Sequence, residues 1–221
     1  FIFPFVQLAI WSLENIKNNI PFELIFNSFL IGFVVALAAS VIAVILSLGS
    51  FKDSNRIFFN LSTIGYAIPG SVIAVALLLV FNFYFGLSIT VFGMWGLFMC
   101  LLIRFITPLI RYLDAALSNM TQETLSATKI YSKSLLKTFR NIYLPALYPS
   151  LLLGFLVVFI EVIKEQPATL LLRPVGFDTL SSKIYNFTSE GQWELAATPS
   201  IAMILLSLIL VLVLNNRVDS E

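Results

Sequence analysis

The chain has 221 residues, of which 59% are hydrophobic and only 11% are charged, and its mean hydropathy is +0.96. Soluble proteins average about 45–50% apolar and about 25% charged residues, so this composition excludes a soluble globular protein and indicates an integral membrane protein. The net charge of +1 argues against nucleic-acid binding, and the lack of histidine excludes imidazole from any metal site or general base. The single cysteine, Cys100, lies in an apolar run and is interpreted as a packing residue.

Apolar runs along the chain predict six membrane helices, because a span of the bilayer core needs about 20 apolar residues. The first run is shorter than that. We interpret it as part of a truncated helix rather than a signal peptide, since no basic region precedes it and no small-residue cleavage site follows it. The expected fold is therefore all-α and membrane-integral, with residues 1–221 forming one domain. The predicted helices cover residues 1–13, 25–48, 57–83, 89–110, 142–164 and 195–214.

Lysine and arginine are distributed unevenly between the segments that connect these helices. Most of them follow the second and fourth predicted helices or lie in the C-terminal tail, namely Lys52, Arg56, Arg111, Lys129, Lys133, Lys137, Arg140 and Arg217. On the other side, the few basic residues are balanced by acidic ones. The positive-inside rule therefore predicts that the loop at residues 111–141 and the C-terminus are cytoplasmic.

The third predicted helix contains the segment GYAIPG, residues 65–70, about midway along its length. Pro69 has no backbone N–H and its ring clashes with the preceding turn, so a kink or local break is expected there. Transporters expose such broken helices to a solute pathway. Glycine and proline are also frequent in ordinary membrane helices, which leaves a plain packing kink as the alternative.

The loop before the fifth predicted helix reads as a basic amphipathic helix. One face would carry Leu125, Tyr131, Leu135, Phe139 and Ile142, and another face Lys129, Lys133 and Lys137. We expect the apolar face to dock on a cytosolic partner, because it has no evident partner in the membrane core of the chain. An interfacial helix with its lysines among anionic lipid headgroups is the alternative.

The fifth predicted helix ends with ionisable residues. Glu161 lies 16 residues after Pro145, or about 24 Å at 1.5 Å per residue, which places it deep in the outer leaflet. Glu161 and Glu165 are expected to share a face, with Lys164 pairing to Glu161 at i, i+3. Such groups face protein, water or a passing solute, or else form a snorkelling cluster at the interface. The long outer segment 166–194 that follows includes an amphipathic stretch, LSSKIYNF.

Two stretches of sequence resemble known permeases. The basic loop resembles the coupling (EAA) loop of ABC-importer permeases: Ser126, Ala127 and Thr128 stand at the EAA positions, Ser132 at the glycine, and Ile142, Leu144 and Pro145 at the Ile-x-Leu-Pro end. The segment GYAIPG, together with EQPATLLLRP at residues 165–174 and the following GFDTL, resembles the second membrane module of ferric-iron ABC-importer permeases, with Gln166 where that family has leucine.

This resemblance implies a type I importer transmembrane domain in the bacterial inner membrane. Ferric iron delivered by a periplasmic binding protein would cross between this module and a second permease module. A cytoplasmic ABC ATPase dimer, which binds ATP and Mg, would drive the process. The chain itself has no phosphate-loop motif, and we expect no catalytic residue, metal site or cofactor in it. Alternatives are the same machine carrying thiamine, a polyamine, a phosphonate or an oxyanion, or a secondary transporter with Glu161, Lys164 and Glu165 as an ion relay.

The resemblance also implies roles for individual residues. Those expected to couple to the ATPase are Leu125, Ser126, Ala127, Thr128, Ser132, Leu135, Phe139, Ile142, Leu144 and Pro145, and those expected along the pathway are Tyr66, Pro69, Gly70, Glu161, Glu165 and Thr169.

Overall fold

The structure, a computed structural model, describes residues 2–15, 21–52, 60, 62, 64–86, 88–121 and 135–218. These residues form helices, and no strand occurs among them. The elements are α1 (Ile2–Asn15), α2 (Phe22–Lys52), the 3-10 turn η1 (Gly65–Ala67), α4 (Gly70–Phe85), α5 (Ile89–Ser118), α7 (Leu135–Thr138), the π-helical η2 (Phe139–Tyr143), α8 (Leu144–Lys164), α9 (Pro167–Leu172), α10 (Leu180–Ser189) and α11 (Trp193–Val218). Within the described residues, 4 helices are long and apolar enough to span a membrane, and they correspond to α2, α5, the helix ending at Lys164, and α11.

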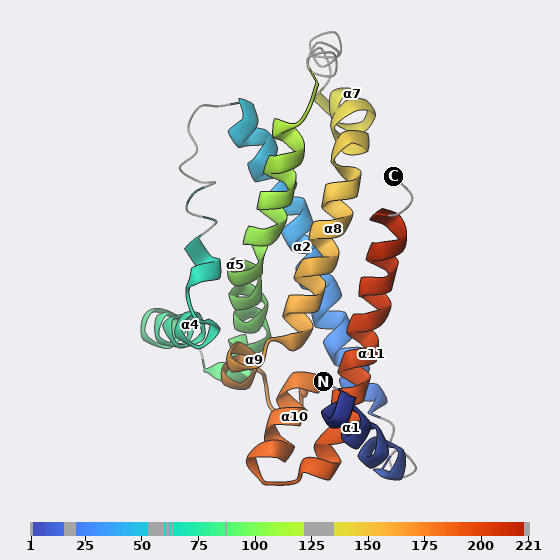
Figure 1. The fold of residues 1–221 in the computed structure, drawn as a ribbon. Coiled ribbons are helices and arrows are strands. Elements are labelled where there is room, and N and C mark those ends of the chain that lie inside the picture. Colours follow the sequence, from blue (N-terminus) through green and yellow to red (C-terminus); the bar gives the residue numbers. More distant parts are fainter. Residues whose placement is uncertain are drawn as a thin grey trace.

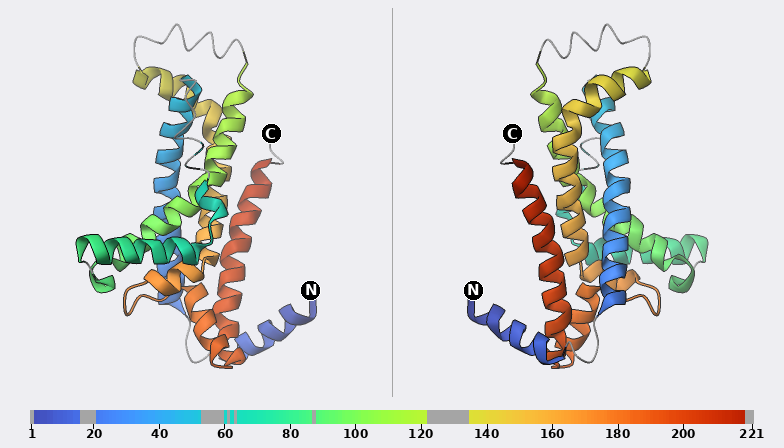
Figure 2. Two further views of the ribbon diagram at one scale, coloured as in Figure 1. Left: turned by 90° about the vertical axis from the view of Figure 1, so that its left-hand side faces the viewer. Right: turned by 90° about the vertical axis from the view of Figure 1, so that its right-hand side faces the viewer.

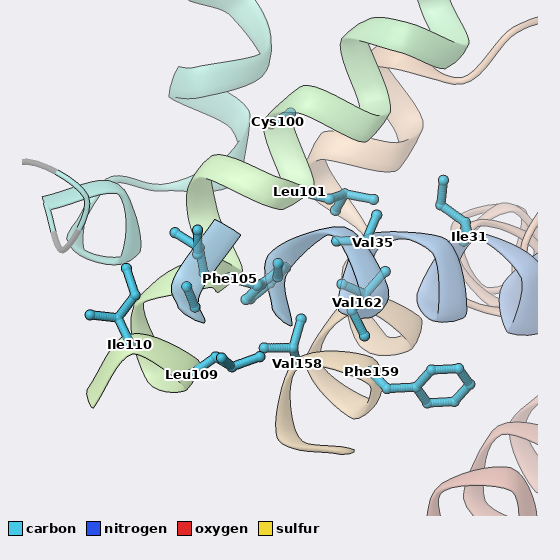
Figure 3. Packing of buried hydrophobic residues seen from close by; sticks show 14 of the residues in the cluster. Ile31, Val35, Cys100, Leu101, Phe105, Leu109, Ile110, Val158, Phe159 and Val162 are labelled. Atoms are coloured by element: carbon cyan, nitrogen blue, oxygen red, sulfur yellow. The ribbon is translucent and has the colours of Figure 1, made fainter. Parts of the chain in front are cut away.

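The core is formed where α2, α5 and α8 pack against one another. α5 contributes a stripe of buried residues at every fourth position, the spacing that places side chains on one face of a helix. The stripe consists of Leu97, Leu101, Phe105, Leu109, Leu113 and Leu117. Figure 3 shows how Leu101 from this stripe meets Val35 of α2 and Val162 of α8.

Small residues allow these three helices to approach closely, as is usual inside membranes. α2 turns the fully buried Ala36, Ala39 and Ala43 toward its neighbours. In α8, a Cβ added at Gly154 would lie 2.9 Å from Cγ of Leu109, so α5 and α8 touch where this glycine leaves room.

The bundle has two distinct ends (Figure 1). We call one the loop end: α5 finishes there after Ser118, α7 begins there at Leu135, and the C-terminal end of α11 lies on the same side. We call the opposite one the α10 end, where α9, α10 and the start of α11 gather. α11 packs mainly against α1 and α10 and contacts α8 less extensively. The end of α2 lies on the same side, so basic residues near the ends of α2, η2 and α11 share the loop end (Figure 1).

The prediction of one spanning helix over residues 57–83 is wrong. η1 ends at Ala67, Ile68 is extended (φ −85°, ψ 131°), and α4 starts at Gly70 with Pro69 as its N-cap residue. An extended conformation is what a residue before proline prefers, and proline has no N–H with which to continue a preceding helix. α4 is left as a 16-residue helix, shorter than a membrane span, that lies at a steep angle to the long helices and projects sideways from the bundle (Figure 2).

The start of α8 also differs from a simple helix beginning at Pro145. α7, the π-helical η2 and α8 follow one another without a break, and the N–H of Leu144 bonds to the carbonyl of Phe139, five residues back. Pro145 stands in the first turn of α8, where its missing N–H is tolerated. π-helical turns inside α-helices are rare and occur often at functional sites, which draws attention to this junction.

Candidate functional site

The segment GYAIPG lies against the middle of α5, and its two glycines make the approach possible. A Cβ at Gly65 would lie 2.2 Å from the backbone oxygen of Ile103, so only glycine fits there. The carbonyl of Gly70 accepts a weak bond from the thiol of Cys100 at 3.7 Å. Between the two glycines, the rings of Tyr66 and Phe105 pack in a T-shaped arrangement, with centroids 6.5 Å apart. The break is thus held against α5 by backbone contact as well as by side chains.

A buried ion pair lies next to the break. Nη1 of Arg104, in α5, donates to Oε1 of Glu165 at 2.9 Å. The Glu165 side chain is 6% exposed and that of Arg104 is 23% exposed, so the pair is largely removed from solvent. Removing one partner of a buried pair costs about 3–5 kcal/mol in soluble proteins, because an uncompensated charge is left behind. Ionisable residues inside spanning segments commonly pair in this way and mark solute pathways.

Glu165 is not on α8, which corrects the prediction that it shares a helix face with Glu161. α8 ends at Lys164, and Glu165 is extended (φ −70°, ψ 117°). Pro167 explains the end of the helix, because its ring would clash with the carbonyl four residues earlier. Oε1 of Glu165 also accepts the N–H of Ala168 at 3.3 Å, and the Glu165 carbonyl accepts the Thr169 hydroxyl at 2.8 Å. The carboxylate is consequently turned toward α5.

Glu161 points elsewhere and has a different partner. Its Oε1 accepts from Nζ of Lys164 at 2.7 Å, the i, i+3 pair that the spacing predicts. The two side chains are 33% and 46% exposed, and exposed pairs contribute only about 0–1 kcal/mol in water. The structure therefore brings together Gly70, Glu165 and Thr169, with Tyr66 and Pro69 on the adjoining break, and leaves Glu161 outside this group.

These two ion pairs determine the net charge of the site. Each of the two carboxylates expected to offset the charge of a cation already has its own cationic partner, so the described group carries no excess negative charge. Within the part of the chain that the structure describes, no group of 3 or more His, Cys, Asp or Glu side chains could hold a metal ion.

The expected coupling residues divide into two sets. Leu125, Ser126, Ala127, Thr128 and Ser132 lie outside the described residues. Leu135 begins α7, Phe139 and Ile142 lie in η2, and Leu144 and Pro145 begin α8, all at the loop end.

One expectation for this segment is wrong. Phe139 is partly buried and packs against the core of the chain, so it does not belong to an unpartnered docking face. Exposed residues around it include Lys137, Arg140, Asn141 and Pro145. The π-helical turn rotates the side chains relative to a regular α-helix, which a spacing of three and four residues does not anticipate.

Arg104 is not among the pathway residues expected from the sequence. A signal for it exists, since one arginine interrupts the apolar run of residues 89–110, and an ionisable residue inside a membrane helix is a functional candidate in its own right. Its Nε atom is buried and has no hydrogen-bond partner among the described residues. Its guanidinium carbon lies 5.2 Å from the centroid of the Phe105 ring.

The segment 166–194 is held to the bundle by specific contacts. α10 begins with a capping box formed by Thr179 and Ser182, and its first N–H donates to the buried Ser28 hydroxyl of α2 at 2.8 Å. The side chain of Arg173 pairs with Asp178 in the preceding turn. A cavity of about 580 Å³ opens beside α10, between the starts of α2 and α11.

Comparison with known proteins identifies the family. Residues 32–219 match the family described as binding-protein-dependent transport system inner membrane components. The chain belongs to this family. Its helices form the transmembrane domain of a type I ABC importer, which confirms the predicted fold class.

One curated relative bears on the substrate. The Fe(3+)-transport system permease protein FbpB 2 of Haemophilus influenzae (strain ATCC 51907 / DSM 11121 / KW20 / Rd) is 28% identical over 216 residues. The alignment covers 92% of this chain but 41% of the relative, so the chain spans less than half of that protein's length. The resemblance to ferric-iron ABC permeases is thereby confirmed at the level of the family.

Proposed function

We propose that this chain is a permease module that passes ferric iron, released by a periplasmic binding protein, across the inner membrane. The observation that carries the transport role is the interrupted helix of residues 65–70 beside the buried Arg104–Glu165 pair, inside a bundle of membrane-spanning length. Broken helices and buried ionisable groups serve solute passage in membrane transporters. The support for iron comes from the relative named for Fe(3+) transport.

The loop end would face the cytoplasm and contact the ATPase. α5 leads into this end and α7 leads out of it, so residues 125–145 connect the helix beside the break to the start of α8. Arg140 and Pro145 are exposed there and are available to a partner. The ATPase would supply the energy of ATP hydrolysis, and a second permease module would complete the route.

An anionic substrate is the second candidate, and one observation favours it. The Arg104 side chain is 23% exposed, and its buried Nε has no protein acceptor among the described residues, while the neighbouring carboxylate is already paired. A phosphonate or another oxyanion would find hydrogen-bond donors there, whereas a bare cation would meet no free carboxylate of Glu165. Thiamine and polyamines, being cationic, gain nothing from this arrangement.

Uptake by the whole transporter tests these assignments. The full-length permease, its ATPase and its binding protein are reconstituted in proteoliposomes, and ATP-dependent accumulation of labelled Fe(III) is measured against labelled phosphonate, an oxyanion, thiamine and a polyamine. Iron accumulation that needs both ATP and the binding protein supports the proposal. Accumulation of another solute in place of iron refutes the substrate, and uptake driven by an ion gradient without ATP refutes the importer mechanism.

A further inference from the structure

Arg104 connects parts of the chain that are distant in sequence. It lies in α5, 61 residues from its partner Glu165, and its guanidinium is pressed against Gly70 at the start of α4. A Cβ added at Gly70 would lie 2.1 Å from Nη1 of Arg104 and 2.4 Å from Oε1 of Glu165. The pair therefore occupies the space that any other residue at position 70 would need.

Glu165 extends this connection to the α10 end. Besides the pair with Arg104, its carbonyl accepts hydrogen bonds from the hydroxyls of Thr169 and Ser181, at 2.8 Å and 3.0 Å. Those residues belong to α9 and α10, and α4 in turn packs against α9. The ion pair thus joins α5 to the break and to the turn after α8, and the backbone carbonyl of Glu165 joins that turn to the two short helices beyond it.

We propose that Arg104 is a positioning residue for transport: it keeps the break at residues 65–70 and the turn at residues 165–169 together as one unit attached to α5. The inference rests on the proposed function, because it assigns both segments to the solute route. α5 continues from Arg104 past the internal Pro108 to Ser118 at the loop end, so motion imposed there would reach the break and the turn through this one helix. Arg104 acts through Glu165 and Gly70 and does not need to touch the solute.

The decisive variant removes both charges. Single replacements, Arg104→Gln or Glu165→Gln, leave a buried unpaired charge, which lowers the stability of the folded protein by itself. The double variant Arg104→Gln with Glu165→Gln leaves none. In the reconstituted complex of full-length permease, ATPase and binding protein, we expect this double variant to keep the parental Tm and basal ATP hydrolysis. Its maximal uptake rate and its stimulation of hydrolysis by loaded binding protein should fall at least about tenfold, with an unchanged half-saturating concentration of binding protein.

Three further variants sharpen the test. Gly70→Ala displaces the pair without altering any charge and should reproduce the loss of uptake, whereas Gly49→Ala in α2, where a Cβ would meet nothing within 4 Å, is the matched control and should transport at the parental rate. Arg104→Lys retains the positive charge and should recover part of the uptake lost in Arg104→Gln.

Parental uptake by the double variant or by Gly70→Ala overturns the proposal. So does a double variant whose Tm and basal hydrolysis fall together with uptake, because that pattern shows a purely structural role. Failure of the proposed substrate is seen separately, in a parental complex that accumulates no iron. The positioning role is then judged from stimulation of ATP hydrolysis by the binding protein, which does not require the solute to be iron.

Discussion

Gly65→Ala tests the close contact between the broken helix and α5. In the structure a Cβ at this position lies 2.2 Å from the backbone oxygen of Ile103 and 3.0 Å from the Cγ2 atom of the same residue. An ordinary contact begins near 3.4 Å, so the two backbones have to separate by about 1.2 Å. The obstructing atom belongs to the α5 backbone, which is packed on α2 and α8, and η1 is therefore the element that moves.

The expected cost follows from overpacking. Forcing an extra methyl group into a filled contact destabilises proteins by about 1–3 kcal/mol. For a chain of 150–250 residues, each 1 kcal/mol lowers Tm by about 2–4 °C, so a decrease of about 2–12 °C is expected. The uptake rate should fall by more than the loss of folded protein explains, because Tyr66 and Pro69 are displaced from α5 along with Gly65.

The assay uses Cys100, which is buried in α5 and bonded to the Gly70 carbonyl. With other cysteines of the full-length protein replaced, a thiol-reactive fluorophore labels Cys100 only when the contact between α4 and α5 opens. Labelling during a temperature ramp gives Tm, and proteoliposome uptake gives the transport rate. Gly49→Ala serves again as the control, since alanine in an open helical position is tolerated.

Two results would refute this reasoning. A parental Tm in Gly65→Ala would show that the segment is not held tightly against α5. A lowered Tm with a parental uptake rate per folded molecule would show that the position of the break has no bearing on transport.

Five other substitutions probe three separate parts of the chain. Pro69→Ala should leave uptake within about twofold of the parent and cost only about 0.4–1 kcal/mol of folding free energy. Position 69 is the N-cap of α4, where the N–H of an alanine would have no helical carbonyl to bond. A large loss of uptake would contradict this prediction. Phe139→Asp should reduce the amount of folded protein in the membrane, because Phe139 packs against the core. Arg140→Glu should leave folding intact and weaken co-purification of the ATPase, because Arg140 is exposed. The opposite pattern would assign the packing role to Arg140 and the docking role to Phe139. Ser28→Ala removes the acceptor of the first N–H of α10 and should lower Tm by the equivalent of about 1–3 kcal/mol. The control Ser47→Ala should leave Tm unchanged, because the buried Ser47 hydroxyl has no partner among the described residues. Equal Tm values for the two variants would refute a stabilising role of the Ser28 hydrogen bond.

The sequence by itself determined the features that depend on neighbouring residues. Spanning length and apolar composition predict the helices now seen as α2, α5, α8 and α11, because a helix in lipid satisfies its own backbone. The interruption near Pro69 follows from the missing N–H and from the restriction on the residue before proline. The pair of Lys164 with Glu161 follows from helical spacing alone.

Only the tertiary structure decided which distant groups meet. Arg104 and Glu165 are 61 residues apart in the sequence, and no local pattern predicts that Nη1 of Arg104 and Oε1 of Glu165 lie 2.9 Å apart. Whether Phe139 faces a partner or the core depends on the π-helical turn and on the packing beneath it. The reason for a glycine at position 70 is also visible only in the structure, where the Arg104–Glu165 ion pair occupies the space that a side chain would need.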